Sequence, residues 1–129
     1  MKKRVTGIGG IFFKATNPKK LQAWYKKHLG LPLAPGWGGW QFHWREAKNP
    51  RKKGCTVWSA FAADTNYFKP GKKPFMINCR VANLKRVLVE LRQEGVTVDA
   101  KTEESAFGKF GWVMDCDGNR IELWEPPKR

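Results

Sequence analysis

Acidic side chains are almost absent from the first part of this 129-residue chain. Residues 1–73 contain 2 acidic and 16 basic residues, whereas residues 74–129 contain 9 of each, so the first part carries the whole net charge of +14. Such asymmetry is typical of proteins with an anionic partner, which can be a nucleic acid, an acidic surface or an acidic ligand. It also fits a solvated lysine face that keeps a protein soluble. We favour the solvated face, because charge alone specifies no site, and we expect no nucleic-acid partner, because the sequence has no nucleic-acid-binding motif.

Long apolar runs and paired cysteines are also missing. The longest uncharged stretch, residues 29–44, is interrupted by two prolines and four glycines, so we expect no membrane-spanning helix. The basic start is followed by Gly7, Gly9 and Gly10 rather than by a signal-peptide core, which predicts a leaderless cytoplasmic chain. The three cysteines are odd in number and widely spaced, a pattern that matches neither a disulfide framework nor a zinc site.

An internal repeat organises the chain. Residues 11–30 and 77–95 each contain a short apolar strand pattern, an asparagine, an amphipathic helix pattern and a glycine. Asn17 and Asn83 are predicted N-caps, because a side-chain oxygen at this position can accept from the free backbone N–H groups of the first turn. Apolar residues at spacings of three and four predict helices that end at Gly30 and Gly95.

Strand patterns follow each predicted helix. They are Trp40–Arg45 and Cys55–Phe61 in the first half, and Val96–Asp99, Lys109–Met114 and Arg120–Glu125 in the second. Each half therefore consists of a strand, a helix and two or three further strands, which predicts an α+β fold with antiparallel pairing inside each half.

Two segments resemble a known family. The segment GIGGIFFKATNPKKLQAWYKKHLGL near the start and the segment FGWVMDCDGNRIELWEPP near the end are similar to the vicinal oxygen chelate superfamily of glyoxalases, bleomycin resistance proteins and extradiol dioxygenases. The resemblance implies a single domain over residues 1–129, built from two paired βαβββ modules whose curved sheets surround a central cavity. Module one would span about residues 4–68 and module two about residues 74–126. It also implies a homodimer, since members of this superfamily often pair.

The resemblance further implies where a divalent metal would be held. Metal enzymes of the superfamily place one ligand on the first and one on the last strand of each module, and these positions fall on Gly10, Trp58, Met76 and Glu122. Glycine has no donor, indole has no free lone pair, and a thioether suits soft ions only. One carboxylate does not hold a catalytic divalent ion against water. We therefore predict no bound metal and no cofactor.

Strand alternation assigns further side chains to the cavity. Because successive residues point to opposite faces, the four positions above define the face by parity. By the same parity, His43 is expected to point away from the cavity. Glu122 is the candidate functional carboxylate, either as a base or as a ligand anchor. The candidate ligand-binding residues are Phe12, Lys14, Phe42, Trp44, Trp58, Met76, Asn78, Arg80, Trp112 and Trp124.

Two interpretations of this aromatic set stay open. An apolar cleft with a few polar groups is the usual form of a small-molecule site, and aromatic walls suit flat or amphipathic molecules. The same aromatics can instead fill a closed core, with Glu122 paired to Arg80 or Arg120. We predict a metal-free protein of the glyoxalase/bleomycin resistance type that binds a small aromatic or amphipathic molecule. The alternative is a metal-dependent lyase, isomerase or dioxygenase of the same superfamily that uses Glu122.

Overall fold

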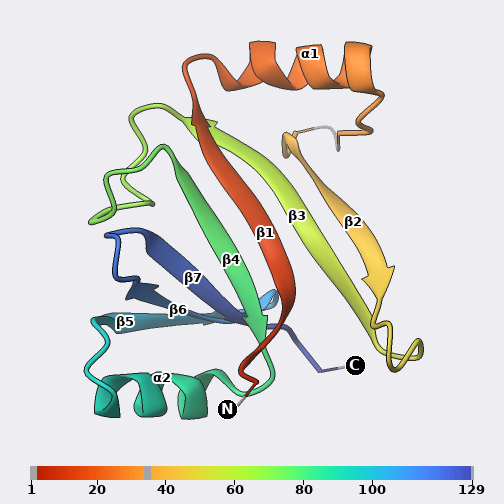
Figure 1. Cartoon of the computed structure of the whole chain (residues 1–129). Helices are drawn as coiled ribbons and strands as arrows, with labels where there is room; N and C mark the ends of the chain where they lie inside the picture. Colours follow the sequence, from red (N-terminus) through yellow and green to blue (C-terminus); the bar gives the residue numbers. More distant parts are fainter. Residues whose placement is uncertain (1–2, 34–35, 129) are drawn as a thin grey trace.

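The computed structural model describes residues 3–33 and 36–128 and contains two helices and seven strands (Figure 1). No helix in these ranges is long and apolar enough to cross a membrane. In chain order the elements are β1 (Val5–Ala15), α1 (Pro18–Leu29), β2 (Gly39–Arg45), β3 (Lys53–Ala62), β4 (Phe75–Val81), α2 (Leu84–Gln93), β5 (Val98–Ser105), β6 (Gly108–Met114) and β7 (Arg120–Glu125).

Both predicted helices are present and begin at the predicted caps. The side chain of Asn17 accepts from the backbone N–H of Lys20 at 3.1 Å, and that of Asn83 accepts from Arg86 at 3.1 Å. Gly30 ends α1 in the left-handed conformation with φ 67°. Local sequence thus determines both helices, as expected for caps that act within one turn.

The strands form one mixed sheet in the order β2-β3-β1-β4-β7-β6-β5. Antiparallel pairing of β1 with β4 joins the two halves at its centre, whereas β1–β3 and β4–β7 are parallel. The second half is a βαβββ unit. The first half has one strand fewer, because its described residues between α1 and β2 form no strand. The predicted α+β class is confirmed, and the sheet is curved.

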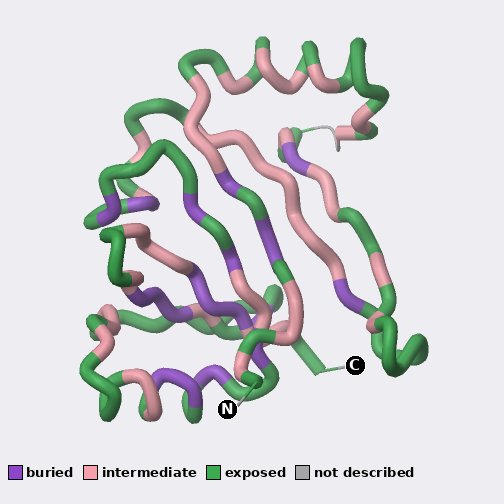
Figure 2. Tube along the Cα trace, in the orientation of Figure 1, coloured by how far each residue is buried: buried purple, intermediate pink, exposed green. Residues whose placement is uncertain are grey.

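The two faces of the sheet have separate cores. On the face that carries the helices, α2 packs Leu84, Val87 and Leu88 against strand residues that include Val113 and Leu123. The opposite face, which we call the inner face, carries a second cluster of Phe12, Phe68, Met76 and Trp112. Figure 2 shows that buried residues follow the central strands and α2, whereas α1 contains none.

Candidate functional site

Glu122 lies at the centre of the inner face, next to Asn78 on β4 and Trp112 on β6 in the strand register. It is 2% exposed. Its Oε1 accepts from Asn78 Nδ2 at 2.7 Å, and its Oε2 accepts from Trp112 Nε1 at 3.0 Å and from the Tyr67 hydroxyl. Three donors therefore satisfy this buried carboxylate, whereas Arg80 and Arg120, the partners that the sequence suggested, form no ion pair with it.

The environment of Glu122 changes the acidity of two groups. Burial raises the pKa of the Glu122 carboxyl, and the hydrogen bonds from Tyr67, Asn78 and Trp112 oppose this rise. Burial and the neighbouring Glu122 charge raise the pKa of the Tyr67 phenol far above its ordinary value. The Tyr67 phenol therefore keeps its proton at physiological pH and donates a hydrogen bond to Glu122.

A loop between β3 and β4 covers this carboxylate. Phe68 is 1% exposed and packs edge-on against Phe61 at a centroid distance of 5.1 Å. Tyr67 stacks on Phe61 at 5.7 Å and meets Trp112 edge-on at 6.3 Å. The centre of the inner face is therefore packed by its own side chains. Lys14 also lies here, with Nζ 5.8 Å from the centroid of the Phe68 ring.

Tyr67 and Phe68 are not among the residues predicted from the sequence. Both follow β3 in a loop, where strand alternation says nothing about direction. The available signal was two adjacent aromatic residues in an otherwise polar connection, Asp64 to Lys73. Large apolar side chains in a loop indicate that the loop packs against a core.

Arg80 lies on the same face, two residues beyond Asn78 on β4. Its guanidinium carbon is 5.0 Å from the centroid of the Trp124 ring and 5.5 Å from that of the Trp44 ring. Within the described ranges, the one hydrogen bond of its side chain runs from Nη1 to the Cys55 Sγ at 3.9 Å, and a thiol is a weak acceptor. Arg80 is thus held between two aromatic rings.

Trp44 reaches Arg80 through a gap in the sheet. β1 pairs with β3 from Gly10 and Val57 onwards. The N-terminal parts of the two strands, which precede these residues, lie further apart (Figure 1). A Cβ atom on Gly7 would lie 2.7 Å from the Trp44 ring, and one on Gly54 would also overlap it. These two glycines make room for the ring, because any side chain there would occupy its place.

The structure corrects the predicted faces of the first half. Trp58 lies on the helix face, 4.8 Å from Tyr25 and 5.3 Å from Phe13 between ring centroids. Phe42 pairs with Thr56 and shares that face, so neither residue lines the inner face. His43 pairs with Cys55, which places it on the inner-face side, contrary to expectation. The alignment of the first half with the second was wrong by one residue on β2 and β3, which explains these errors. A shift of one residue moves every side chain of a strand to the opposite face.

Apart from Trp44, the other predicted residues share the inner face. Phe12 pairs with Met76, Asn78 with Glu122, and Arg80 with Trp124 in the strand register, and paired residues point to the same side. Trp44 belongs to the helix face by alternation, but its ring reaches Arg80 through the gap. Phe110 stacks on Trp124 at 6.0 Å and extends the aromatic surface.

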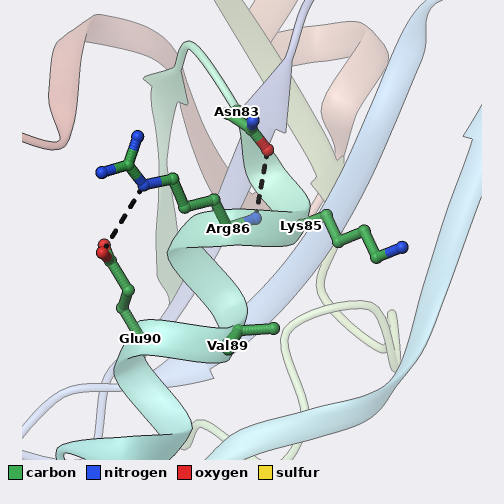
Figure 3. Close-up of a pocket in the computed structure, with 5 residues that line it drawn as sticks. All are labelled: Asn83, Lys85, Arg86, Val89 and Glu90. Carbon is green, nitrogen blue, oxygen red and sulfur yellow. Dashed lines mark hydrogen bonds and ion pairs between the residues drawn. The ribbon is translucent and has the colours of Figure 1, made fainter.

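A surface hollow on α2 is a different feature. It is lined by Asn83, Lys85, Arg86, Val89 and Glu90 (Figure 3). Asn83 caps the helix, and Arg86 pairs with Glu90 at 3.6 Å. Because α2 packs on the helix face, this hollow lies on the opposite side of the sheet from Glu122.

Solved structures with the same architecture are known. The methylmalonyl-CoA epimerase from Mycobacterium tuberculosis matches with a TM-score of 0.62 and 19% identity over 99% of this chain and 93% of that one. The epimerase from Streptomyces coelicolor matches with a TM-score of 0.68 and 15% identity over 96% and 99%. A glyoxalase/bleomycin resistance protein/dioxygenase superfamily member from Vibrio splendidus 12B01 matches with a TM-score of 0.57 and 8% identity over 92% and 97%. The chain has the vicinal oxygen chelate fold. No protein-family model and no curated protein matches its sequence.

The positions that hold metal in enzymes of the vicinal oxygen chelate fold do not suit a metal in this chain. Three of the four predicted ligand positions, Gly10, Met76 and Glu122, lie on the inner face. The fourth, Trp58, lies on the other face, and its neighbours Val57 and Ser59 are the residues of β3 that face inwards at this level. Among residues 3–33 and 36–128, no group of three or more His, Cys, Asp or Glu side chains is arranged around a possible ion. The remaining oxygen nearby, Asn78 Oδ1, points into the space left by Gly9. This donor set does not fit a catalytic divalent ion.

Proposed function

We propose that the protein binds a small aromatic or amphipathic molecule on its inner face without a metal ion. The observation that supports this most strongly is the state of Glu122, whose two oxygens are already bound by Tyr67, Asn78 and Trp112. Aromatic side chains continue from this centre along the same face to Trp124 and Phe110. We also propose that the protein acts in the cytoplasm as a homodimer.

Ligand entry follows from the difference in burial along the inner face. Around Glu122 the residues Met76 and Phe68 are 0% and 1% exposed. Towards Arg80 the face is more open, because Arg80, Trp44 and Phe110 are half-buried. We propose that the ligand lies at this open end, against the half-buried Phe110 ring and the part of Trp124 that remains accessible, since Trp124 is 9% exposed.

Fluorescence of N-phenyl-1-naphthylamine, a neutral aromatic probe, tests the proposal. We expect saturable binding with one probe per chain and energy transfer from tryptophan to the probe. Trp124→Phe should weaken binding by about tenfold, because the stacking surface shrinks and the bond to the Phe107 carbonyl is lost. Trp58→Phe is the matched control, since Trp58 lies on the helix face, and its affinity should equal that of the wild type. Absence of saturable binding would contradict the proposed function.

An enzyme that uses Glu122 is the second candidate. The raised pKa of this buried carboxyl favours it, since acid–base groups in active sites are often perturbed in this way. A metal-dependent reaction would require donors that the described residues do not place around Glu122. One metal ion per chain in the purified protein, lost in Glu122→Gln, would favour this candidate over a binding protein.

A further inference from the structure

We infer that Arg80 binds an acidic group, a carboxylate, sulfonate or phosphate, on the ligand of the inner face. This inference rests on the proposed function, which it makes more specific. It assigns the ligand to a chemical class, the aromatic oxyanions. The acidic group of the ligand would lie on Arg80 and its rings beside Trp124 and Phe110.

Arg80 has hydrogen-bond donors that the protein does not use. Three arginines in the described ranges are half-buried: Arg4, Arg80 and Arg120. Arg4 pairs with Glu90 and Glu94, and Arg120 pairs with Asp99 at 3.3 Å and donates to the Tyr67 carbonyl. In the described part of the chain, Arg80 is the one of the three whose guanidinium has no oxygen acceptor, and the only hydrogen bond of its side chain goes to the Cys55 thiol. A guanidinium carries five N–H groups that match an oxyanion in pairs.

The walls of the Arg80 site are fixed by other contacts. Trp44 Nε1 donates to Thr56 Oγ1 at 2.9 Å, and Trp124 Nε1 donates to the Phe107 carbonyl at 2.7 Å. Gly9 lets both neighbours approach β1, since a Cβ atom there would lie 2.9 Å from Arg80 Cγ and from Trp124. The guanidinium is therefore oriented before any ligand arrives, which lowers the entropy cost of binding.

The surroundings of Arg80 indicate what the rest of the ligand is. Arg80 lies next to Trp124 in the register, and the Phe110 ring stacks parallel to the Trp124 ring with an interplanar angle of 4°. An acid group on Arg80 would therefore place an attached ring system against the half-buried Phe110 ring and the accessible part of Trp124. The net charge of +14 adds a long-range attraction for anions, although it does not select among them.

Two related dyes test this inference. 1-Anilinonaphthalene-8-sulfonate has the same rings as N-phenyl-1-naphthylamine and one additional sulfonate. We expect wild type to bind the sulfonate about tenfold more tightly than the neutral dye. Arg80→Gln should make the affinities for the two dyes equal, and Arg80→Lys should retain part of the difference between them, since lysine keeps the charge but loses the planar fork.

Controls separate the Arg80 site from general surface charge. Arg86→Gln removes one arginine charge from the exposed side of α2 and should not change the affinity for either dye. Displacement of the sulfonate dye by benzoate and by phenyl phosphate then shows which oxyanion is preferred, and displacement by neither overturns the inference. Equal affinity of wild type for the two dyes also overturns the inference, as does an equal loss of affinity for the sulfonate dye in Arg80→Gln and Arg86→Gln. In both cases the proposed function stands. Failure of both dyes to bind contradicts the proposed function itself.

Discussion

Glu122 is a buried carboxylate whose two oxygens accept hydrogen bonds, at a position where the resemblance places a metal ligand. A buried charge destabilises a protein unless hydrogen bonds compensate for its lost hydration. Asn78, Trp112 and Tyr67 supply three such bonds here, two from neighbouring strands and one from the loop above. The two oxygens of Glu122 are therefore fully hydrogen-bonded, and any ligand that replaces Tyr67 must itself donate to this carboxylate.

The pKa of Glu122 gives a prediction for stability. Its pKa in the folded protein is raised above 4.5, so above that pH the folded state holds the proton more tightly than the unfolded state. Stability from this group is full at low pH and decreases as the pH rises above 4.5 towards the folded pKa. Glu122→Gln does not titrate, so the free energy of unfolding of wild type relative to this variant should fall as the pH rises from about 4.5 to neutral. Urea unfolding at a series of pH values measures this difference. A difference that grows with pH would show instead that the three donors lower the pKa.

At the scale of elements, the pairing of β1 with β4 depends on a glycine at position 9. The register between β1 and β4 shifts between Ile8 and Gly10, which makes Gly9 the extra residue of a bulge. A Cβ atom on Gly9 would overlap Asn78 Oδ1 and would lie 2.9 Å from Trp124. This crowding connects the Glu122 cluster with the Arg80 site.

Gly9→Ala should therefore affect both sites. We expect a loss of about 2 kcal/mol in the free energy of unfolding, because the methyl group displaces packed side chains. The affinity for the anionic dye should fall as well, since Trp124 and Arg80 Cγ must move. Urea unfolding and dye titration of this variant measure the two effects. An unchanged unfolding free energy would mean that the bulge can open without cost.

The elements also show what the sequence could predict. Asn17, Asn83 and Gly30 act within one helical turn, so the helices were predicted correctly from local signals. The face of Trp58 was wrong, because its assignment relied on aligning two halves with different loop lengths, and one residue exchanges the faces. Tyr67 was missed, since its contact with Glu122 joins residues 55 positions apart, which no local pattern encodes.

At the scale of the whole molecule, the surface of the described residues combines unpaired basic side chains with an exposed apolar patch. Among the described residues, no basic side chain from Lys14 to Lys72 has a carboxylate oxygen within 4.0 Å. Apolar side chains on the middle of the helix face, between α1 and α2, are exposed instead: Ile8, Ile11, Phe75 and Ile77 are 39–48% exposed. The register pairs Ile11 with Ile77 and Phe13 with Phe75, so these residues form a continuous patch.

This patch is the surface through which we expect two copies to pair. Large contiguous apolar patches are uncommon on monomers, and a second copy offers the same uncharged surface, so a two-fold contact is self-complementary. The two chains repel each other through a net charge of +14 each, and salt should therefore strengthen the dimer by screening this repulsion. Ile11→Lys and Ile77→Lys should each shift the protein towards monomer. Val89→Lys adds the same charge on α2 outside the patch and should leave the dimer unchanged. Sedimentation equilibrium at low and high salt measures these populations. A wild-type monomer under both conditions would contradict pairing, and loss of the dimer in Val89→Lys alone would move the interface to α2.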